Sequence, residues 1–220
     1  MRPVRSYVRR EGRFTPAQRH ALATFWSRYG LDAHEPFDAC SVFGRRAPLT
    51  LEIGCGDGVN LETLAGRFPD EDFIGVDVYR PGLGALLGRL TETPLTNLRL
   101  YAADVLDVLD TALPEASLDR VLIFFADPWP KRRHHKRRLV APALLERLAR
   151  VLREEGQIYL ATDDGGYAAA MADCFASDPR FGLVSVRRND PAPFRLPTRF
   201  ERRARRRGAD VHDLEVVRIR

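Results

Sequence analysis

Residues 124–140, FFADPWPKRRHHKRRLV, place three kinds of chemistry side by side. Asp127 is a hydrogen-bond acceptor that suits the N–H edge of a nucleobase, and Trp129 offers an aromatic face on which a base can stack. Pro128 and Pro130 stiffen the loop around the indole, because each proline ring fixes its own φ. The eight residues that follow are all Lys, Arg or His, side chains that contact nucleic-acid phosphates. The stretch predicts a site that holds a base beside a polyanion.

A second group of candidate residues lies at the Gly-rich turn of residues 52–58, EIGCGDG. Its glycines allow a tight turn and a close approach of the backbone to a ligand at a helix N-terminus. A dinucleotide fingerprint needs Gly or Ala at position 59, where this sequence has Val. Asp77 follows Gly58 by 19 residues, a place from which a carboxylate can accept hydrogen bonds from ribose hydroxyls. For the glycines alone, a purely structural turn is the alternative.

These residues need a scaffold, and the hydrophobic pattern predicts one. Apolar strands are expected over 49–53, 72–78, 97–104, 118–127 and 156–163. Helices are expected over 59–67, from near Arg80, over 139–152 and over 167–175. Strands that alternate with helices predict an α/β fold with a Rossmann-like, doubly wound, mostly parallel sheet. After Pro179 the pattern changes, and 181–186 with 213–219 predict an antiparallel edge hairpin with no strong helix between its strands.

The predicted sheet explains where the polar residues fall. Ligands of such sheets bind at the carboxyl ends of the strands, where the strand order reverses. Glu52, Asp77, Asp104 and Asp127 each lie at the end of a predicted strand. Their side chains are therefore expected to meet at one end of the sheet.

The charge of the chain is concentrated in three segments. The net charge is +5, yet residues 1–13, 131–138 and 199–207 together hold 17 Lys or Arg and two Glu, so the remainder is acidic. Basic clusters on an acidic body are typical of a protein that binds a polyanion. A solvated Arg-rich surface would explain one such cluster, but three beside a predicted site favour a nucleic acid.

Length and composition limit the remaining possibilities. We expect a single domain over 1–220, in which residues 1–45 form a basic and helical N-terminal extension. No apolar run approaches the ~20 residues of a membrane span, and no signal peptide is recognisable. The three cysteines fit neither a disulfide framework nor a zinc pattern, and the His pair of the basic run has no metal-ligand spacing. A cytoplasmic protein with no metal, no membrane contact and no obligate protein partner is predicted.

The motifs together resemble a known family. The turn at 52–58 fits E-x-G-x-G-x-G, the first motif of class I S-adenosylmethionine-dependent methyltransferases. DPWPKRRHHKRR (127–138) and ATDDGGYA (161–168) narrow the resemblance to bacterial tRNA (guanine-N7)-methyltransferases. The similarity runs from RSYVRREGRFTPAQ (5–18) to PTRFERRARRRG (197–208), nearly the whole chain. It implies a class I methyltransferase fold, S-adenosylmethionine as methyl donor, and transfer to N7 of the variable-loop guanine 46 of tRNA.

The resemblance also implies which residues form the site. The methyl-donor group comprises Glu52, Gly54, Gly56, Asp77, Asp104 and Asp127, with Asp104 near the adenine. The group that binds the substrate nucleotide comprises Lys131, Asp163, Thr198, Arg199, Phe200 and Glu201. RNA contacts are implied for Arg133, His134, His135, Lys136, Arg137 and Arg138. The sequence departs from the family pattern where Asp77 replaces a common Glu, where Ala126 replaces a common Pro, and in the Arg-rich stretch RRARRRGADVHDL (202–214).

The implied chemistry asks for alignment more than for acid or base catalysis. Guanine N7 attacks through a lone pair and has no proton to lose, so Asp127 is the catalytic candidate as an orienting acceptor. Two alternatives remain open. One is another RNA or amino methyltransferase that uses the D-P-W-P loop. The other is a non-catalytic RNA-binding protein with a vestigial donor site, against which the complete set of donor-site carboxylates argues.

Overall fold

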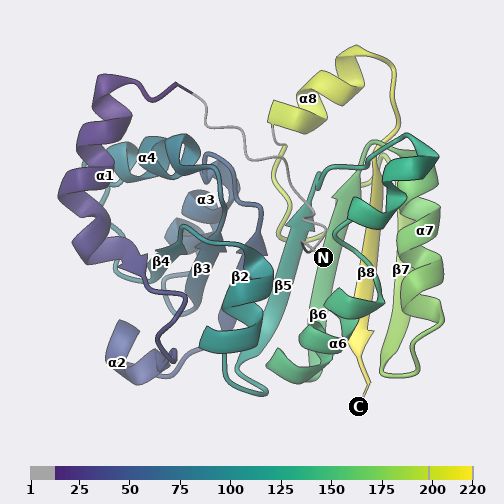
Figure 1. Cartoon of the computed structure of the whole chain (residues 1–220), viewed down its shortest axis with the longest axis horizontal. Helices are drawn as coiled ribbons and strands as arrows, with labels where there is room; N and C mark the ends of the chain where they lie inside the picture. The colour runs from purple at the N-terminus through teal and green to yellow at the C-terminus, as the bar shows by residue number, and fades with distance from the viewer. Residues whose placement is uncertain (1–12, 198, 220) are drawn as a thin grey trace.

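Eight strands form one sheet in the order β1-β4-β3-β2-β5-β6-β8-β7 in the computed structural model, which describes residues 13–197 and 199–219 (Figure 1). The strands are β1 (Gly30–Leu31), β2 (Leu49–Ile53), β3 (Asp72–Val76), β4 (Leu98–Tyr101), β5 (Leu118–Phe124), β6 (Leu152–Thr162), β7 (Phe181–Arg188) and β8 (His212–Arg218). Pairing is parallel from β1 to β6, and β8 is antiparallel to both β6 and β7. The predicted mostly parallel α/β sheet is confirmed.

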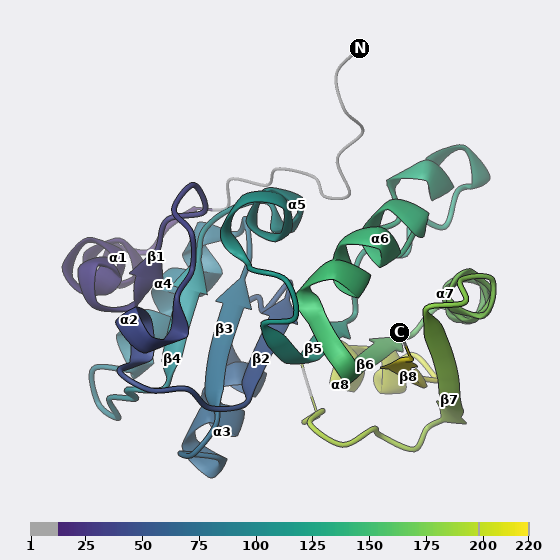
Figure 2. The same ribbon diagram turned by 90° about the horizontal axis from the view of Figure 1, so that it is seen from below.

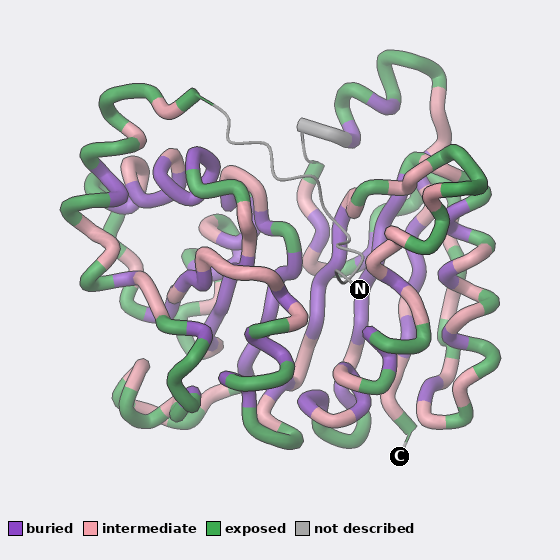
Figure 3. Tube along the Cα trace, viewed as in Figure 1, coloured by how far each residue is buried: buried purple, intermediate pink, exposed green. Residues whose placement is uncertain are grey.

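Helices cover both faces of this sheet (Figure 2). They are α1 (Pro16–Tyr29), α2 (Ala39–Phe43), α3 (Val59–Arg67), α4 (Arg80–Arg89), α5 (Val105–Asp107), α6 (Pro142–Val151), α7 (Gly165–Ala176) and α8 (Arg199–Arg206). A π-helical turn, η1 (Val108–Ala112), follows α5, and the basic run forms a 3-10 helix, η2 (Arg132–Arg137). Burial concentrates in the strands and in the helix faces that contact them (Figure 3).

Two hydrophobic clusters pack against opposite faces of the sheet. Successive side chains of a strand point to opposite faces, and β5 contributes Val121 and Ile123 to one cluster and Leu122 and Phe124 to the other. Apolar residues of α5, α6 and α7 complete the first cluster, whereas those of α1, α3 and α4 complete the second. Strands buried on both faces explain the nearly continuous apolar runs in the sequence.

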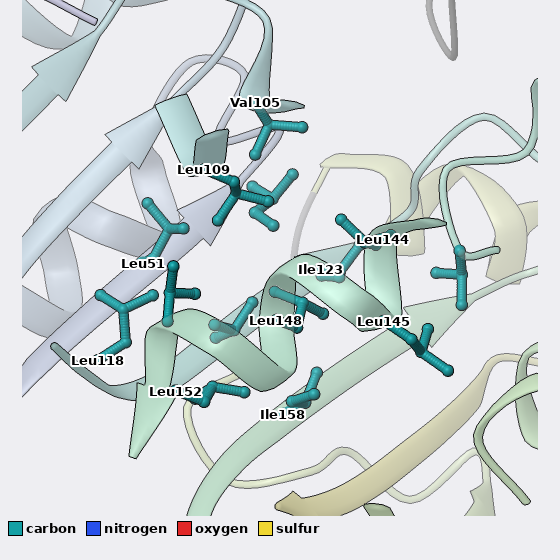
Figure 4. Packing of buried hydrophobic residues seen from close by; sticks show 14 of the residues in the cluster. Leu51, Val105, Leu109, Leu118, Ile123, Leu144, Leu145, Leu148, Leu152 and Ile158 are labelled. Carbon is teal, nitrogen blue, oxygen red and sulfur yellow. The ribbon is translucent and has the colours of Figure 1, made fainter. Parts of the chain in front are cut away.

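Helix α6 shows how one face of the sheet is closed. Its buried residues Leu144, Leu145 and Leu148 follow the 3.6-residue period of an amphipathic helix. Figure 4 shows these leucines above β5 and β6, facing Ile123 and Ile158. The contacts fix the strand whose carboxyl end leads into residues 125–131.

Most predicted elements agree with the structure, with differences at the ends. The helix predicted over 59–67 is α3, and the hairpin predicted at the sheet edge is β7 with β8. The third predicted strand stops at Tyr101, so Asp104 lies three residues beyond it. The expectation of no strong helix between the last two strands is wrong, because α8 occupies Arg199–Arg206. That helix lacks the apolar stripe by which sequence patterns reveal helices.

The N-terminal part of the predicted extension is helical where it is described. Helix α1 begins with a capping box, in which the Thr15 hydroxyl accepts from the Gln18 N–H and the Gln18 side chain accepts from the Thr15 N–H. Residues 1–12, which carry the first basic cluster, lie outside the described residues. Within the part of the chain that is described, no helix combines the length and apolarity needed to cross a membrane.

Candidate active site

The polar strand ends meet at one end of the sheet, called here the carboxyl end. From β2 the chain moves outward to β3 and β4, then returns to β5 on the other side of β2. The strand order therefore reverses at β2 and β5, where sheets of this kind bind their ligands. The Gly-rich turn follows β2, Asp77 follows β3, and the D-P-W-P loop follows β5.

The Gly-rich turn is shaped by backbone that other residues would adopt only with strain. Gly54, Gly56 and Gly58 have φ values of 74°, 61° and 70°, in the left-handed region. A Cβ atom built on Gly54 or Gly56 would have no protein atom within 4 Å, whereas one on Gly58 would lie 2.4 Å from Leu86. Gly58 is thus required by packing, while Gly54 and Gly56 leave space beside the N-terminus of α3.

Asp77 connects the turn to the next strand. Its carboxylate accepts hydrogen bonds from the Gly56 N–H and from the Tyr79 N–H, each at 2.7 Å. Burial raises the pKa of Asp77, and these backbone N–H groups partly oppose the shift. The carboxylate therefore has two tasks, since it holds the turn in place and retains acceptor capacity for a ligand.

Glu52 is a buried carboxyl group beneath the same turn. It is 4% exposed and accepts a hydrogen bond from the Asn60 amide at 3.2 Å. Burial raises its pKa to about 8, the Asn60 bond opposes the shift, and the negative charges of Asp77 and Asp57 add to it. A cationic ligand at the turn would favour the ionised form of Glu52.

This raised pKa predicts how the ligand-free protein responds to pH. The unfolded chain releases the Glu52 proton near its ordinary pKa of 4.5, while the folded chain holds it up to about 8. Between these values the folded state binds more protons, so the free energy of unfolding falls as pH rises, by at most about 1.4 kcal/mol per pH unit. The stabilisation that comes from protonated Glu52 is fully present below pH 4.5 and is lost as pH rises through 8.

Urea unfolding from pH 5 to 8.5 should show a free energy of unfolding that depends less on pH for Glu52→Gln than for the wild type. Parallel profiles would contradict it.

Asp104 begins the short helix α5. Its carboxylate accepts a hydrogen bond from the Leu106 N–H at 3.1 Å, as an N-cap residue does. It follows β4, the strand next to β3 and two places from β2. The structure thus places Asp104, Asp77 and Glu52 at the carboxyl ends of three adjacent strands.

The D-P-W-P loop is held in a restrained conformation. Phe125 and Trp129, which flank Asp127, have φ values of 55° and 46°. Such values cost bulky residues of order 1–3 kcal/mol each, and this kind of strain collects at functional sites. The Arg138 guanidinium donates from Nε to the Pro128 carbonyl at 2.9 Å and fastens the loop to the end of the basic run. Asp127 itself is exposed at the carboxyl end of the sheet.

The basic run folds back over the loop. The guanidinium carbon of Arg137 lies 3.9 Å from the centroid of the Trp129 ring, and the His134 ring meets the indole edge-on at 5.8 Å. One face of the indole is therefore covered by Arg137, although the sequence predicted a face offered to a base. The side chains of Arg133, His135 and Lys136 are exposed on η2, as is Lys131 just before it.

The remaining predicted substrate residues lie after β6 and after β7. Asp163 is exposed at the end of β6, and Asp164 caps α7 by accepting from the Tyr167 N–H at 2.7 Å. Thr198 lies outside the described residues. Arg199 and Phe200 begin α8 and directly precede Glu201.

Glu201 is engaged in a buried ion-pair network. Its carboxylate is paired with Arg195 and, at 2.8 Å, with Arg205. The Arg195 guanidinium also donates to both carboxylate oxygens of Asp213 on β8, at 2.5 and 2.9 Å. Arg195 and Asp213 are fully buried, and Glu201 is nearly so. In this conformation Glu201 fastens α8 to the sheet.

Three residues of the site were missed by the sequence interpretation. Asn60 bridges Glu52 and the Leu196 N–H, while Arg195 and Asp213 hold α8. Asn60 interrupts the apolar pattern of the helix predicted over 59–67, and this interruption is a weak sign in the sequence of a buried polar contact. Arg195 and Asp213 gave none, because one Arg among many cannot be recognised as buried. Among the described residues no group of three or more His, Cys, Asp or Glu could hold a metal ion.

The sheet order and the Gly-rich turn at the reversal point define the fold of a class I methyltransferase, and solved structures agree. The 16S rRNA methyltransferase KamB matches with a TM-score of 0.60 and 18% identity over 100% of both chains. The 16S rRNA (adenine(1408)-N(1))-methyltransferase of Catenulisporales acidiphilia matches with a TM-score of 0.57 and 17% identity, covering 86% of this chain and 92% of that one.

Sequence relatives identify the family within this class. The family described as "Putative methyltransferase" matches residues 46–214. The tRNA (guanine-N(7)-)-methyltransferase of Methylococcus capsulatus is 44% identical, covering 97% of this chain and 93% of that protein. Those of Halorhodospira halophila and Pseudomonas aeruginosa are 44% and 45% identical over 100% of this chain and 96% and 91% of their own. The chain belongs to the tRNA (guanine-N(7)-)-methyltransferase family.

Proposed function

We propose that this protein transfers a methyl group from S-adenosylmethionine to N7 of a guanine in tRNA, the variable-loop guanine 46. The observation that carries the proposal is the arrangement at the carboxyl end of the sheet. A Gly-rich turn with acidic strand ends lies on one side of the reversal point, and the D-P-W-P loop with its basic helix lies on the other. Donor and acceptor sites would thus share one end of the sheet.

The donor-side residues fit a cationic nucleoside. Asp77 has acceptor capacity for ribose hydroxyls, and Asp104 follows the neighbouring strand on the adenine side. The space beside Gly54 and Gly56 admits close approach to the backbone. The buried Glu52 carboxyl favours a positively charged ligand, because a nearby cation would stabilise its ionised form. The bound donor would supply an electrophilic methyl group on a sulfonium.

The acceptor-side residues would orient the guanine. Asp127 lies in a loop whose backbone is restrained by the left-handed residues Phe125 and Trp129 and by the bond from Arg138 to the Pro128 carbonyl. These restraints limit where its acceptor oxygens can lie. Guanine N7 needs no deprotonation, and a fixed approach toward the methyl carbon is the main requirement. Lys131 and Asp163 follow β5 and β6 and would contact the same nucleotide. The exposed cations of η2 would hold the RNA backbone.

Incubation of unmodified tRNA with labelled donor, followed by nucleoside analysis, tests the proposal. N7-methylguanosine makes the strand cleavable at the modified base after borohydride and aniline treatment. A cut at guanine 46 is the expected result. A label in an N2- or N6-methylated nucleoside would favour the amino-methyltransferase alternative, and tRNA binding without transfer would favour a vestigial donor site.

Loss of the Asp77 carboxylate should weaken donor binding. Asp77→Ala is expected to reduce the affinity for S-adenosylmethionine by about 1–3 kcal/mol, because ribose hydroxyls and the Gly56 N–H lose their acceptor. Calorimetric titration measures the change. Asp70→Ala is the control, since it removes an exposed carboxylate from the loop between α3 and β3, away from the carboxyl end of the sheet. Equal donor affinities for wild type and Asp77→Ala would refute this assignment.

Removal of exposed cations from η2 should weaken tRNA binding without affecting the donor site. Arg132, Arg133 and Lys136 are exposed, whereas Arg137 contacts Trp129 and is left intact. The triple change to Ala should raise the tRNA KM and reduce the log–log salt slope by roughly 0.7–0.9 for each lost phosphate contact. Filter binding at several salt concentrations measures the slope. A wild-type slope would mean that η2 is only a solvated surface.

A further inference from the structure

A single side-chain amide joins the donor turn to the segment that leads into α8. Asn60, in the first turn of α3, is 5% exposed. Its Nδ2 donates to Glu52 Oε2 at 3.2 Å, and its Oδ1 accepts from the Leu196 N–H at 3.0 Å. Leu196 lies 136 residues further along the chain. An amide suits such a bridge because it offers donors on one side and an acceptor on the other.

The segment on the far side of this bridge is anchored in steps. The Ala192 N–H donates to Asp213 at 3.1 Å, and the Phe194 ring contacts the Tyr159 ring at 5.5 Å between centroids. Arg195 is then held by Asp213 and Glu201, Leu196 by Asn60, and α8 begins at Arg199. The Asn60 bond thus ties the chain to the donor turn just before the residues assigned to the substrate.

We infer that Asn60 is a positioning residue that couples occupation of the methyl-donor site to the placement of Leu196 and of helix α8, on the side proposed to bind tRNA. The inference rests on the proposed function, since it assumes that the two sites receive donor and tRNA. It assigns Asn60 no contact with the reacting atoms. Its role would be to make the binding of each ligand dependent on the other.

Both the donor site and the segment at Leu196 would act on the same feature, the orientation of the Asn60 amide. In the observed orientation NH₂ faces Glu52 and the oxygen faces the Leu196 N–H. A half-turn would place NH₂ against the Leu196 N–H and the amide oxygen against Glu52, which could donate to it only while protonated, so both hydrogen bonds are lost once Glu52 is ionised. Ionisation of Glu52 by a cationic donor would strengthen the Asn60 bond, because bonds to a charged acceptor are roughly twice as strong. The donor would therefore stabilise the orientation that holds Leu196.

Binding measurements on the full-length protein test the coupling. The affinity for unmodified tRNA is measured with and without saturating sinefungin, an analogue that carries an ammonium group in place of the methylsulfonium and cannot donate a methyl group. In the wild type we expect the ligand to tighten tRNA binding about five-fold or more, with tRNA tightening ligand binding by the same factor. Asn60→Ala should reduce both factors to less than about two-fold. A role limited to folding would lower stability without removing this reciprocity.

Two further variants separate the effect of losing the amide from a general loss of stability. Asn60→Leu lacks the amide but fills its volume, so it should lose the coupling as Asn60→Ala does even if the smaller side chain impairs folding. Thr63→Ala alters an exposed residue of the same helix, whose hydroxyl donates to the Val59 carbonyl, and should retain the coupling. The inference would be overturned if the wild type showed no coupling, or if the variants without the amide kept it. The proposed function would still stand in that case if the wild type methylated guanine N7.

Discussion

Asp127→Ala is expected to reduce the rate of methyl transfer by about 100-fold, while Asp127→Asn retains a larger share of it. The backbone around Asp127 is restrained by left-handed φ values at Phe125 and Trp129, which limits the positions that the carboxylate can take in its proposed contact with the base. Asn keeps one acceptor oxygen there, whereas Ala keeps none and lets the guanine shift. A shift of ~1 Å is enough for a loss of this size in a reaction that depends on alignment.

Single-turnover rates with saturating tRNA and donor measure the effect apart from binding. The order Asp, then Asn, then Ala is the expected result. Asp173→Ala, which removes an exposed carboxylate on α7, is the matched control and should leave the rate unchanged. Equal, near-total loss in both Asp127 variants, with a wild-type rate that rises through a carboxylate pKa, would show that Asp127 acts as a base.

Arg195→Met should lower the free energy of unfolding by about 3–5 kcal/mol. The guanidinium is fully buried and pairs with Asp213 and Glu201, so its loss leaves the Asp213 carboxylate in the interior without its cation and Glu201 with only the partly exposed Arg205. Chemical unfolding at neutral pH measures the change. At this chain length each kcal/mol corresponds to roughly 2–4 °C in Tm.

The matched control uses the other partner of Glu201. Arg205 pairs with the same carboxylate, but its side chain is 46% exposed, so Arg205→Met should cost less than about 1 kcal/mol. Replacing Asp213 by Leu together with Arg195→Met should recover part of the loss, because one unpaired buried charge is then removed. Similar losses in Arg195→Met and Arg205→Met would mean that burial does not set the strength of this network.

The sequence predicted the elements whose formation depends on local pattern. The helix over 59–67 was located at both ends because Gly58, in the left-handed conformation, begins it and the apolar spacing continues to Leu64. Parallel strands were recognisable because both faces are buried, which leaves long apolar runs. The donor-side candidates followed from this, since residues after successive parallel strands must share one end of the sheet.

Features that depend on distant partners could not be predicted. Among the described side chains of helix α8, Glu201 and Ala204 are buried, and Arg195 holds the helix through Glu201. The helix therefore has no apolar stripe from which the sequence could predict it. The contact of Arg137 with Trp129 depends on a loop conformation that bulky residues rarely adopt. For Asn60, one of its two hydrogen-bond partners lies 136 residues away in the sequence.

The position of β8 has a consequence for how the protein is made. β8 lies between β6 and β7, although a ribosome synthesises it after both. Until residues 212–218 emerge, β7 has no neighbour in the sheet, and Arg195 has no Asp213 to pair with. Domains fold as units during synthesis, so the nascent chain would expose an unpaired β6 edge until its last strand arrives. The segment that carries α8 is thus fixed last, which delays completion of the surface proposed to bind RNA until translation of the sheet has finished.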